Sequence, residues 1–173
     1  PDEGTITVGG RTVSALTPTM ATALGIAIVH QHPAVLPDMT VMENLRIALP
    51  PSVFAGQQAN TLARSMLDRV GLHVHLGDRV ETLTLAEKHL LEIAKAFAVE
   101  PTLLVLDEPT APLGRDAVAL LFGLVRDAVA GGTSVVYITH RLAEVRELAT
   151  RVTVLRDGRV RGTATVADTS DDE

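Results

Sequence analysis

The most informative segment of the chain reads LLVLDEPT and spans residues 103–110. Four consecutive apolar residues are typical of a strand buried on both faces of a parallel sheet, and such strands end at the edge where α/β sheets bind ligands. Side chains alternate along a strand, so the adjacent carboxylates Asp107 and Glu108 can serve different purposes at that edge. Pro109 disfavours helical backbone at the residue before it, and we therefore expect Glu108 to be extended.

Strand and helix patterns alternate around this segment. Short apolar runs at residues 26–29, 134–138 and 152–155 predict further strands. Apolar spacing at residues 115–130 and 141–149 predicts helices between the later strands. Strands that alternate with helices of this length favour a parallel sheet with crossover helices.

The middle of the chain differs, because its apolar periodicity is purely helical. Residues 40–49, 57–70 and 85–99 each predict a helix, whereas residues 5–13 predict a small hairpin. The expected organisation is an α/β core of residues 1–39 and 101–167, an inserted helical sub-domain of residues 40–100, and an acidic tail of residues 168–173.

Composition excludes several classes of protein. The 173 residues include three Phe, one Tyr and no Trp and carry a net charge of -6, which argues against a nucleic-acid surface. The absence of Cys excludes disulfides, thiolate zinc sites and cysteine nucleophiles. Residues 12–37 carry no formal charge, but Pro18, Gly25 and Pro33 interrupt them, and we predict no transmembrane helix.

Three further polar positions stand at predicted element ends. Residues 83–87, LTLAE, open a helix whose free N–H groups suit a phosphate, although Thr84 and Glu87 also form an ordinary capping-box pattern. His140 follows the strand at residues 134–138 and could contact a γ-phosphate or simply cap a helix. Gln31 follows the strand at residues 26–29 and could reach Mg²⁺ or water. Each position alone, like the acidic strand end, also has an ordinary structural explanation.

In this order, however, the motifs resemble those of ABC transporter nucleotide-binding domains along nearly the whole chain. Gln31 matches the Q-loop glutamine, residues 83–87 the signature motif, residues 103–108 Walker B, residues 110–114 the D-loop, and His140 the switch histidine. The segments GIAIVHQ, LTLAEKHLLEIAKAF and VVYITHRLAEV are similar to the first cassette of the double-cassette ATPases that drive ribose, galactose and xylose import.

The resemblance implies a P-loop NTPase-like fold and a subunit that couples ATP hydrolysis to transport of a monosaccharide. It assigns Glu108, His140 and Gln31 to catalysis, and Asp107 with Gln31 to Mg²⁺. It assigns contact with ATP held by an opposing cassette to Thr84, Leu85, Ala86 and Glu87.

The resemblance also implies partners and a location. These are transmembrane permease subunits, a second ABC cassette and, indirectly, a periplasmic or extracellular sugar-binding protein, at the cytoplasmic face of the membrane. The permease's coupling helix would dock near residues 31–60. No nucleic-acid partner is expected.

Departures from the family pattern set further expectations. No G-x-x-x-x-G-K-[ST] phosphate loop occurs in the sequence, whose two lysines are Lys88 and Lys95, so we expect the chain alone to bind ATP poorly. Matching the first residues to the family places the start after the P-loop helix. In the family the P-loop strand lies between the strands that match residues 134–138 and 152–155, so its loss should leave a gap, an exposed apolar edge or a non-native pairing there.

The signature and the D-loop also diverge. Leu85 and Ala86 replace glycines of the signature, and Gly114 replaces the aspartate of the D-loop. These changes keep open the alternative of a non-hydrolysing, ABC-like binding or regulatory module.

Overall fold

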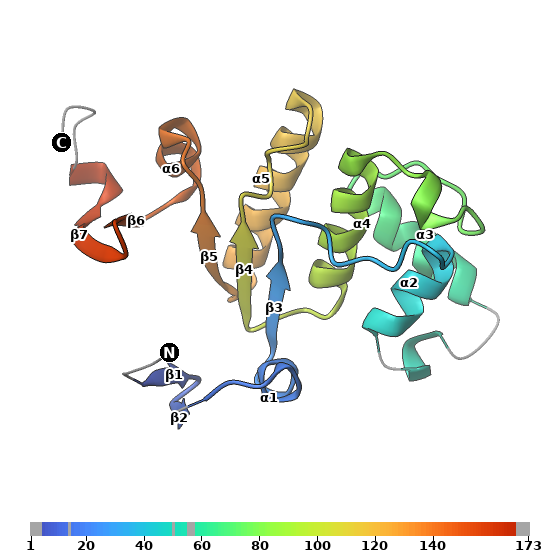
Figure 1. The fold of residues 1–173 in the computed structure, drawn as a ribbon, viewed down its shortest axis with the longest axis horizontal. Coiled ribbons are helices and arrows are strands. Elements are labelled where there is room, and N and C mark those ends of the chain that lie inside the picture. Colours follow the sequence, from blue (N-terminus) through green and yellow to red (C-terminus); the bar gives the residue numbers. More distant parts are fainter. Residues whose placement is uncertain (1–4, 14, 50, 55–57, 169–173) are drawn as a thin grey trace.

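A computed structural model of the chain describes residues 5–13, 15–49, 51–54 and 58–168. Its centre is a three-stranded parallel sheet in the order β3 (Ile26–Val29), β4 (Leu103–Asp107) and β5 (Ser134–Ile138). The strands run in one direction, so their carboxyl ends meet at one edge (Figure 1). The predicted parallel α/β core is therefore confirmed.

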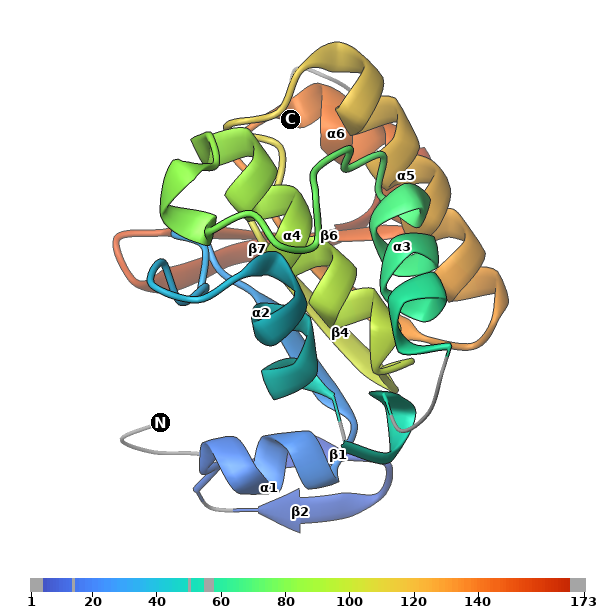
Figure 2. The same cartoon turned by 90° about the vertical axis from the view of Figure 1, so that its right-hand side faces the viewer.

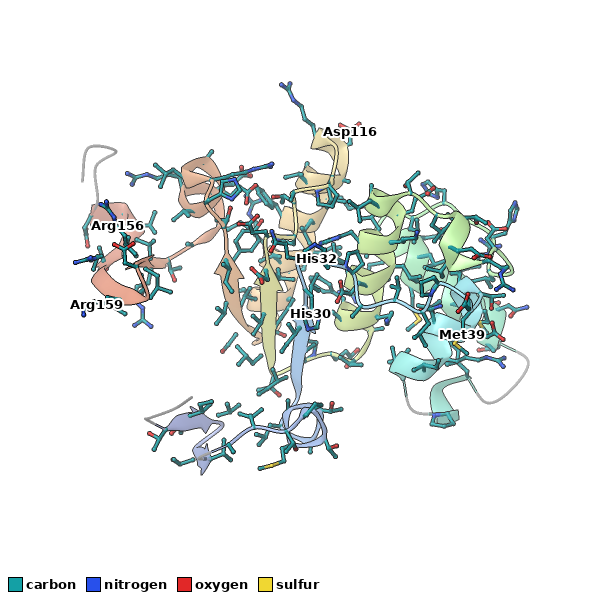
Figure 3. The ribbon with its side chains drawn as sticks, viewed as in Figure 1. His30, His32, Met39, Asp116, Arg156 and Arg159 are labelled. Carbon is teal, nitrogen blue, oxygen red and sulfur yellow. The ribbon has the colours of Figure 1, made fainter. Side chains whose placement is uncertain are left out.

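Two helices follow the strands of this sheet. They are α5 (Arg115–Ala130), which joins β4 to β5, and α6 (Leu142–Leu148). Helix α5 lies along one face of the sheet (Figure 2) and buries Leu121, Leu124 and Val125. Asp116 marks the start of α5 in Figure 3, at the end of the molecule where β4 stops.

The opposite face of the sheet is open among the described residues. Ile28, Val136 and Ile138 point to this face and are 44%, 47% and 46% exposed. Strand β6 (Arg151–Arg156) does not continue the sheet, and within the described ranges it pairs only with β7 (Arg159–Thr165). Within the described ranges the sheet therefore ends at β5.

Three helices form a group beside the sheet: α2 (Val41–Ala48), α3 (Ala59–Arg69) and α4 (Leu85–Ala98), with 3-10 turns η1 (Pro51–Phe54) and η2 (Val80–Thr82). Helix α4 runs opposite to the strands, so its first turn lies toward the end where the strands stop (Figure 1). The boundaries of the helical sub-domain at residues 40 and 100 stay a prediction.

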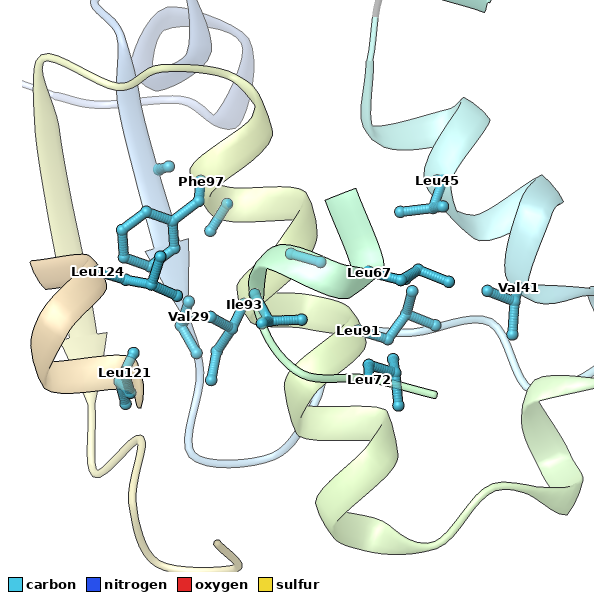
Figure 4. Close-up of a cluster of buried hydrophobic side chains, with 14 of the residues drawn as sticks. Val29, Val41, Leu45, Leu67, Leu72, Leu91, Ile93, Phe97, Leu121 and Leu124 are labelled. Atoms are coloured by element: carbon cyan, nitrogen blue, oxygen red, sulfur yellow. The ribbon is translucent and has the colours of Figure 1, made fainter. Parts of the chain in front are cut away.

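Helix α4 joins the two halves of the core (Figure 4). Its Ile93 and Phe97 pack in the same cluster as Val29 of β3, while Leu91 belongs to the part formed with Leu67 of α3. Leu91 and Ile93 are at most 1% exposed. Because α4 has neighbours on two sides, its buried residues extend over more than one helical face, from His89 and Leu91 to Ile93 and Phe97.

The remaining elements are the hairpin β1 (Ile6–Val8) and β2 (Arg11–Val13), helix α1 (Pro18–Ala23) and η3 (Val166–Asp168). The hairpin was predicted and α1 was not. Beyond Asp168, the predicted acidic tail lies outside the described residues. No helix in the described ranges combines the length and apolar character needed to cross a bilayer.

Candidate functional site

The structure brings Glu108 and His140 into direct contact. Glu108 is the first residue after β4, and His140 lies just beyond β5. His140 Nδ1 is 3.0 Å from Glu108 Oε1. The imidazole side chain is 68% exposed and the carboxylate 27%, so the pair faces solvent at the edge of the sheet. We call these two residues the Glu108–His140 pair.

The backbone of Glu108 differs from our expectation. Its φ is +45°, in the left-handed region, so the prediction of an extended Glu108 was wrong. The Glu108 N–H still donates to the Ile138 carbonyl at 2.9 Å, and the Glu108 carbonyl accepts from the Ala111 N–H at 3.2 Å. The chain turns at Glu108 because it leaves the sheet there, and this turn accompanies the contact of its carboxylate with His140.

Asp107 and Gln31 lie at the same edge. Asp107 ends β4 opposite Ile138, while Gln31 follows β3, whose Val29 pairs with Leu106. Asp107 is half-buried and Gln31 is exposed. In the described part of the chain, no hydrogen bond links Gln31 to the Glu108–His140 pair. The edge therefore gathers all four groups, but only two of them touch.

The first turn of α4 carries the predicted signature residues. Glu87 Oε2 accepts from the Thr84 N–H and from its hydroxyl, both at 2.8 Å, and Thr84 Oγ1 accepts from the Glu87 N–H at 3.3 Å. The capping-box explanation is thus confirmed for these two side chains. Helix geometry leaves the N–H groups of Leu85 and Ala86 without an intrahelical acceptor. Leu85 is 60% exposed, so this turn faces outward.

Sequence reasoning missed a second polar cluster beside β3. Glu92 Oε1 accepts from the His30 N–H at 3.2 Å and lies 2.9 Å from His30 Nδ1. Glu92 is 3% exposed. Its place between Leu91 and Ile93, inside a buried helix, was the signal that could have found it. Lys95 Nζ donates to the Ala34 carbonyl at 2.8 Å nearby.

A cavity of about 250 Å³ adjoins this second cluster and is lined by His30, Glu92 and Lys95 together with apolar residues of β3 and α4. Burial lowers the pKa of Lys95, and Glu92 opposes that shift. His30 is labelled in Figure 3 at the end of β3. Glu108 and His140 do not line this cavity, so the chemistry of the carboxylate–imidazole pair lies elsewhere.

Comparison with known proteins places this geometry in a family. The profile of a family described as ABC transporter matches residues 1–111, a range that includes Gln31, Asp107 and Glu108. The ribose import ATP-binding protein RbsA of Rhodococcus jostii is 39% identical over 177 residues that cover 100% of this chain and 35% of that protein. A putative ribose/galactose/methyl galactoside import ATP-binding protein of Agrobacterium fabrum is 39% identical over 92% of this chain and 32% of its own length.

Solved structures agree on the fold. A dimeric ATP-binding cassette in a post-hydrolysis state with ADP and Pi has a TM-score of 0.82 at 22% identity, over 96% of this chain and 75% of that one. An ATP-binding subunit of an ABC transporter has a TM-score of 0.72 at 25% identity, over 83% of this chain and 60% of that one. The chain spans about a third of the length of the curated relatives that it matches. On the evidence of the profile and of these relatives, the chain belongs to the ABC transporter family.

Proposed function

We propose that the chain is part of the ATP-binding subunit of an ABC importer that couples ATP hydrolysis to the uptake of a monosaccharide. The 3.0 Å contact between Glu108 and His140 is the observation that carries the proposal. It supplies a carboxylate and an imidazole together at the ligand-binding edge of a parallel sheet. The relatives that are named for ribose or for ribose/galactose import support the choice of solute.

In this proposal Glu108 is the general base. Its carboxylate accepts a proton from the water that attacks the γ-phosphate, a role that requires hydrogen-bond reach to that water. His140 uses Nδ1 toward Glu108, which leaves Nε2 for a phosphate oxygen. The His140 side chain is 68% exposed and the Glu108 side chain is partly exposed, which suits a substrate that approaches from solvent.

Asp107 and Gln31 are the proposed contacts for Mg²⁺. No group of three or more acidic, histidine or cysteine residues able to hold a metal occurs in the described ranges. That result fits a nucleotide-borne Mg²⁺, which takes one or two protein oxygens and completes its shell with phosphate and water. When bound, the ion neutralises charge on the phosphates.

The first turn of α4 is the proposed contact with ATP held by an opposing cassette. The available N–H groups of Leu85 and Ala86 and the positive end of the helix suit a phosphate. Thr84 and Glu87 hold that turn in shape through the capping box. The dimeric state of one similar cassette structure supports an opposing cassette as partner.

The further partners that we propose are transmembrane permease subunits and, through them, an external sugar-binding protein. The chain would then work at the cytoplasmic face of the membrane, with residues 31–60 near the permease. We also propose that the 173-residue chain alone binds MgATP weakly, because it has no phosphate-loop lysine.

Glu108→Gln tests the proposal in the complete natural protein that carries this sequence. The amide keeps the shape but cannot take the proton, so we expect ATP turnover to fall by a factor of about 100 or more, with ATP affinity retained. Glu147→Gln is the matched control, since Glu147 is 52% exposed and pairs with Arg126 away from the site. Wild-type turnover in Glu108→Gln would contradict the assignment. A complete protein that binds ATP without hydrolysing it would favour the non-hydrolysing module instead.

A further inference from the structure

A buried carboxylate is hydrogen-bonded to residues that lie close in sequence to each member of the Glu108–His140 pair. Glu144, in the first turn of α6, is 6% exposed. Its Oε1 accepts from Thr110 Oγ1 at 2.6 Å and from Arg141 Nη1 at 3.4 Å. Its Oε2 accepts from Thr139 Oγ1 at 2.8 Å and from the Tyr137 hydroxyl at 3.0 Å. Four donors thus converge on one carboxylate, two on each oxygen.

These donors come from both sides of the pair. Thr110 belongs to the loop that begins at Glu108, and it is 2% exposed. Thr139 and Arg141 flank His140 directly, and the Arg141 N–H also donates to Thr139 Oγ1 at 3.0 Å. Glu144 therefore ties the loop that carries the carboxylate to the loop that carries the imidazole.

The ionised state of the Glu144 carboxylate suits its contacts with both loops. Burial raises the pKa of Glu144, but hydrogen bonds from Thr110, Thr139 and Tyr137 and the charge of Arg141 outweigh that effect and bring the pKa below its ordinary value. An ionised carboxylate only accepts hydrogen bonds, so every donor must point to it. Bonds to a charged, buried acceptor are also stronger than neutral ones.

Among the described residues, the His140 ring makes one hydrogen bond, to Glu108. Its side chain is 68% exposed, and its contact with Glu108 is with a residue at positive φ. A residue in that conformation relaxes unless its surroundings hold it. Small displacements of reacting groups reduce rates strongly, by as much as about 100-fold for 1 Å.

We propose that Glu144 is a positioning residue that holds the side chains of Glu108 and His140 at the distance and orientation that hydrolysis requires. This inference rests on the proposed function of the pair, and it adds a residue outside the matched motifs. It predicts that turnover depends on the hydrogen bonds from Thr110 and Thr139 to Glu144. Turnover should not depend on the hydrogen bond from the Tyr137 hydroxyl, because Tyr137 lies within β5 and is fixed there by strand pairing.

The test compares variants that each remove one hydrogen bond to the same carboxylate. In the complete natural protein, Thr110→Val and Thr139→Val should each lower kcat by a factor of about 10 or more and change KM for MgATP by less than about threefold. Tyr137→Phe should keep kcat within about twofold of wild type, although it loses a bond of the same kind. Glu144→Ala should lower kcat further, and Glu147→Ala on the same helix should not.

Two results would overturn the inference: equal loss of kcat in Tyr137→Phe and Thr139→Val, or unchanged kcat in both threonine variants. Each of these variants removes one hydroxyl and leaves the rest of the side chain nearly unchanged in shape, so the comparison holds even where Glu144→Ala fails to fold.

A second readout does not depend on ATP hydrolysis. In the 173-residue chain with labelled histidine, the ring resonances of His140 should shift in Thr139→Val and in Glu108→Gln and stay in place in Tyr137→Phe. Absence of turnover in the wild-type protein would refute the proposed function, and the His140 resonances would still decide whether Glu144 positions the pair. Unmoved resonances in Thr139→Val would refute the positioning role alone.

Discussion

At the scale of single residues, His89 lies in a buried site that disfavours a charge on its ring. It is 0% exposed in α4, and neither ring nitrogen has a hydrogen-bond partner among the residues that the structure describes. Burial lowers the pKa of His89, His32 adds to this shift, and Glu92 opposes it. The folded state therefore disfavours the protonated imidazole relative to the unfolded chain, in which a histidine titrates near pH 6.5.

The sign of the pH dependence follows. A lowered pKa in the folded state means that the unfolded chain binds more protons below about pH 6.5, so stability falls as the pH drops through that value. One such group contributes a slope of at most about 1.4 kcal/mol per pH unit. We expect the free energy of unfolding in urea to fall between pH 8 and pH 5.5, with a smaller fall in His89→Leu. Equal slopes in the two proteins would contradict this account.

The proximity of Glu108 to His140 could be predicted from the sequence, because residues that follow neighbouring parallel strands meet at one edge of the sheet. The turn at Glu108 could not be predicted, because it goes with a hydrogen bond from the Ala111 N–H to the Glu108 carbonyl that Pro109 does not announce. The role of Glu144 was hidden for a similar reason. One acidic residue in a short helix has no distinguishing pattern, and its donors come from elements that only the fold brings together.

At the scale of elements, periodic segments were predicted well. The expected ranges 26–29, 115–130 and 134–138 coincide with β3, α5 and β5. Helix α1 was missed because it has six residues, no buried side chain and therefore no apolar face to read. Its N-cap, in which Thr17 Oγ1 accepts from the Met20 N–H, was the signal available.

Two capping boxes allow a test of whether the first turn of α4 does more than start a helix. Thr40 caps α2 and Thr84 caps α4 with the same side-chain pattern. We expect Thr40→Ala and Thr84→Ala each to lower the free energy of unfolding by about 1 kcal/mol, because each loses an N-cap hydrogen bond. Turnover of the complete protein should fall only in Thr84→Ala, measured at saturating MgATP under conditions where both variants are folded. Parallel losses of turnover in the two variants would leave Thr84 with a structural role alone.

At the scale of the whole molecule, the sheet carries the candidate site residues at its carboxyl edge and an uncovered apolar surface beside them. Strand β5 has β4 on one side, while β6 pairs with β7, and the apolar side chains of Val136 and Ile138 stay half exposed. The described ranges thus contain the Glu108–His140 pair but no strand that continues the sheet past β5. In the function that we propose, this edge supplies the carboxylate and the imidazole for hydrolysis.

The two lysines bear on how tightly the 173-residue chain can bind MgATP. Lys95 Nζ donates to the Ala34 carbonyl and Lys88 Nζ to the Glu81 carbonyl, so both ammonium groups have partners away from the Glu108–His140 pair. The net charge of -6 further disfavours a polyphosphate. We therefore expect isothermal titration of the folded chain with MgATP to show no saturable binding below about 1 mM, a free energy weaker than about -4 kcal/mol. Circular dichroism should verify that the titrated chain is folded. Micromolar binding would show that the chain cradles the β- and γ-phosphates with groups other than a phosphate-loop lysine.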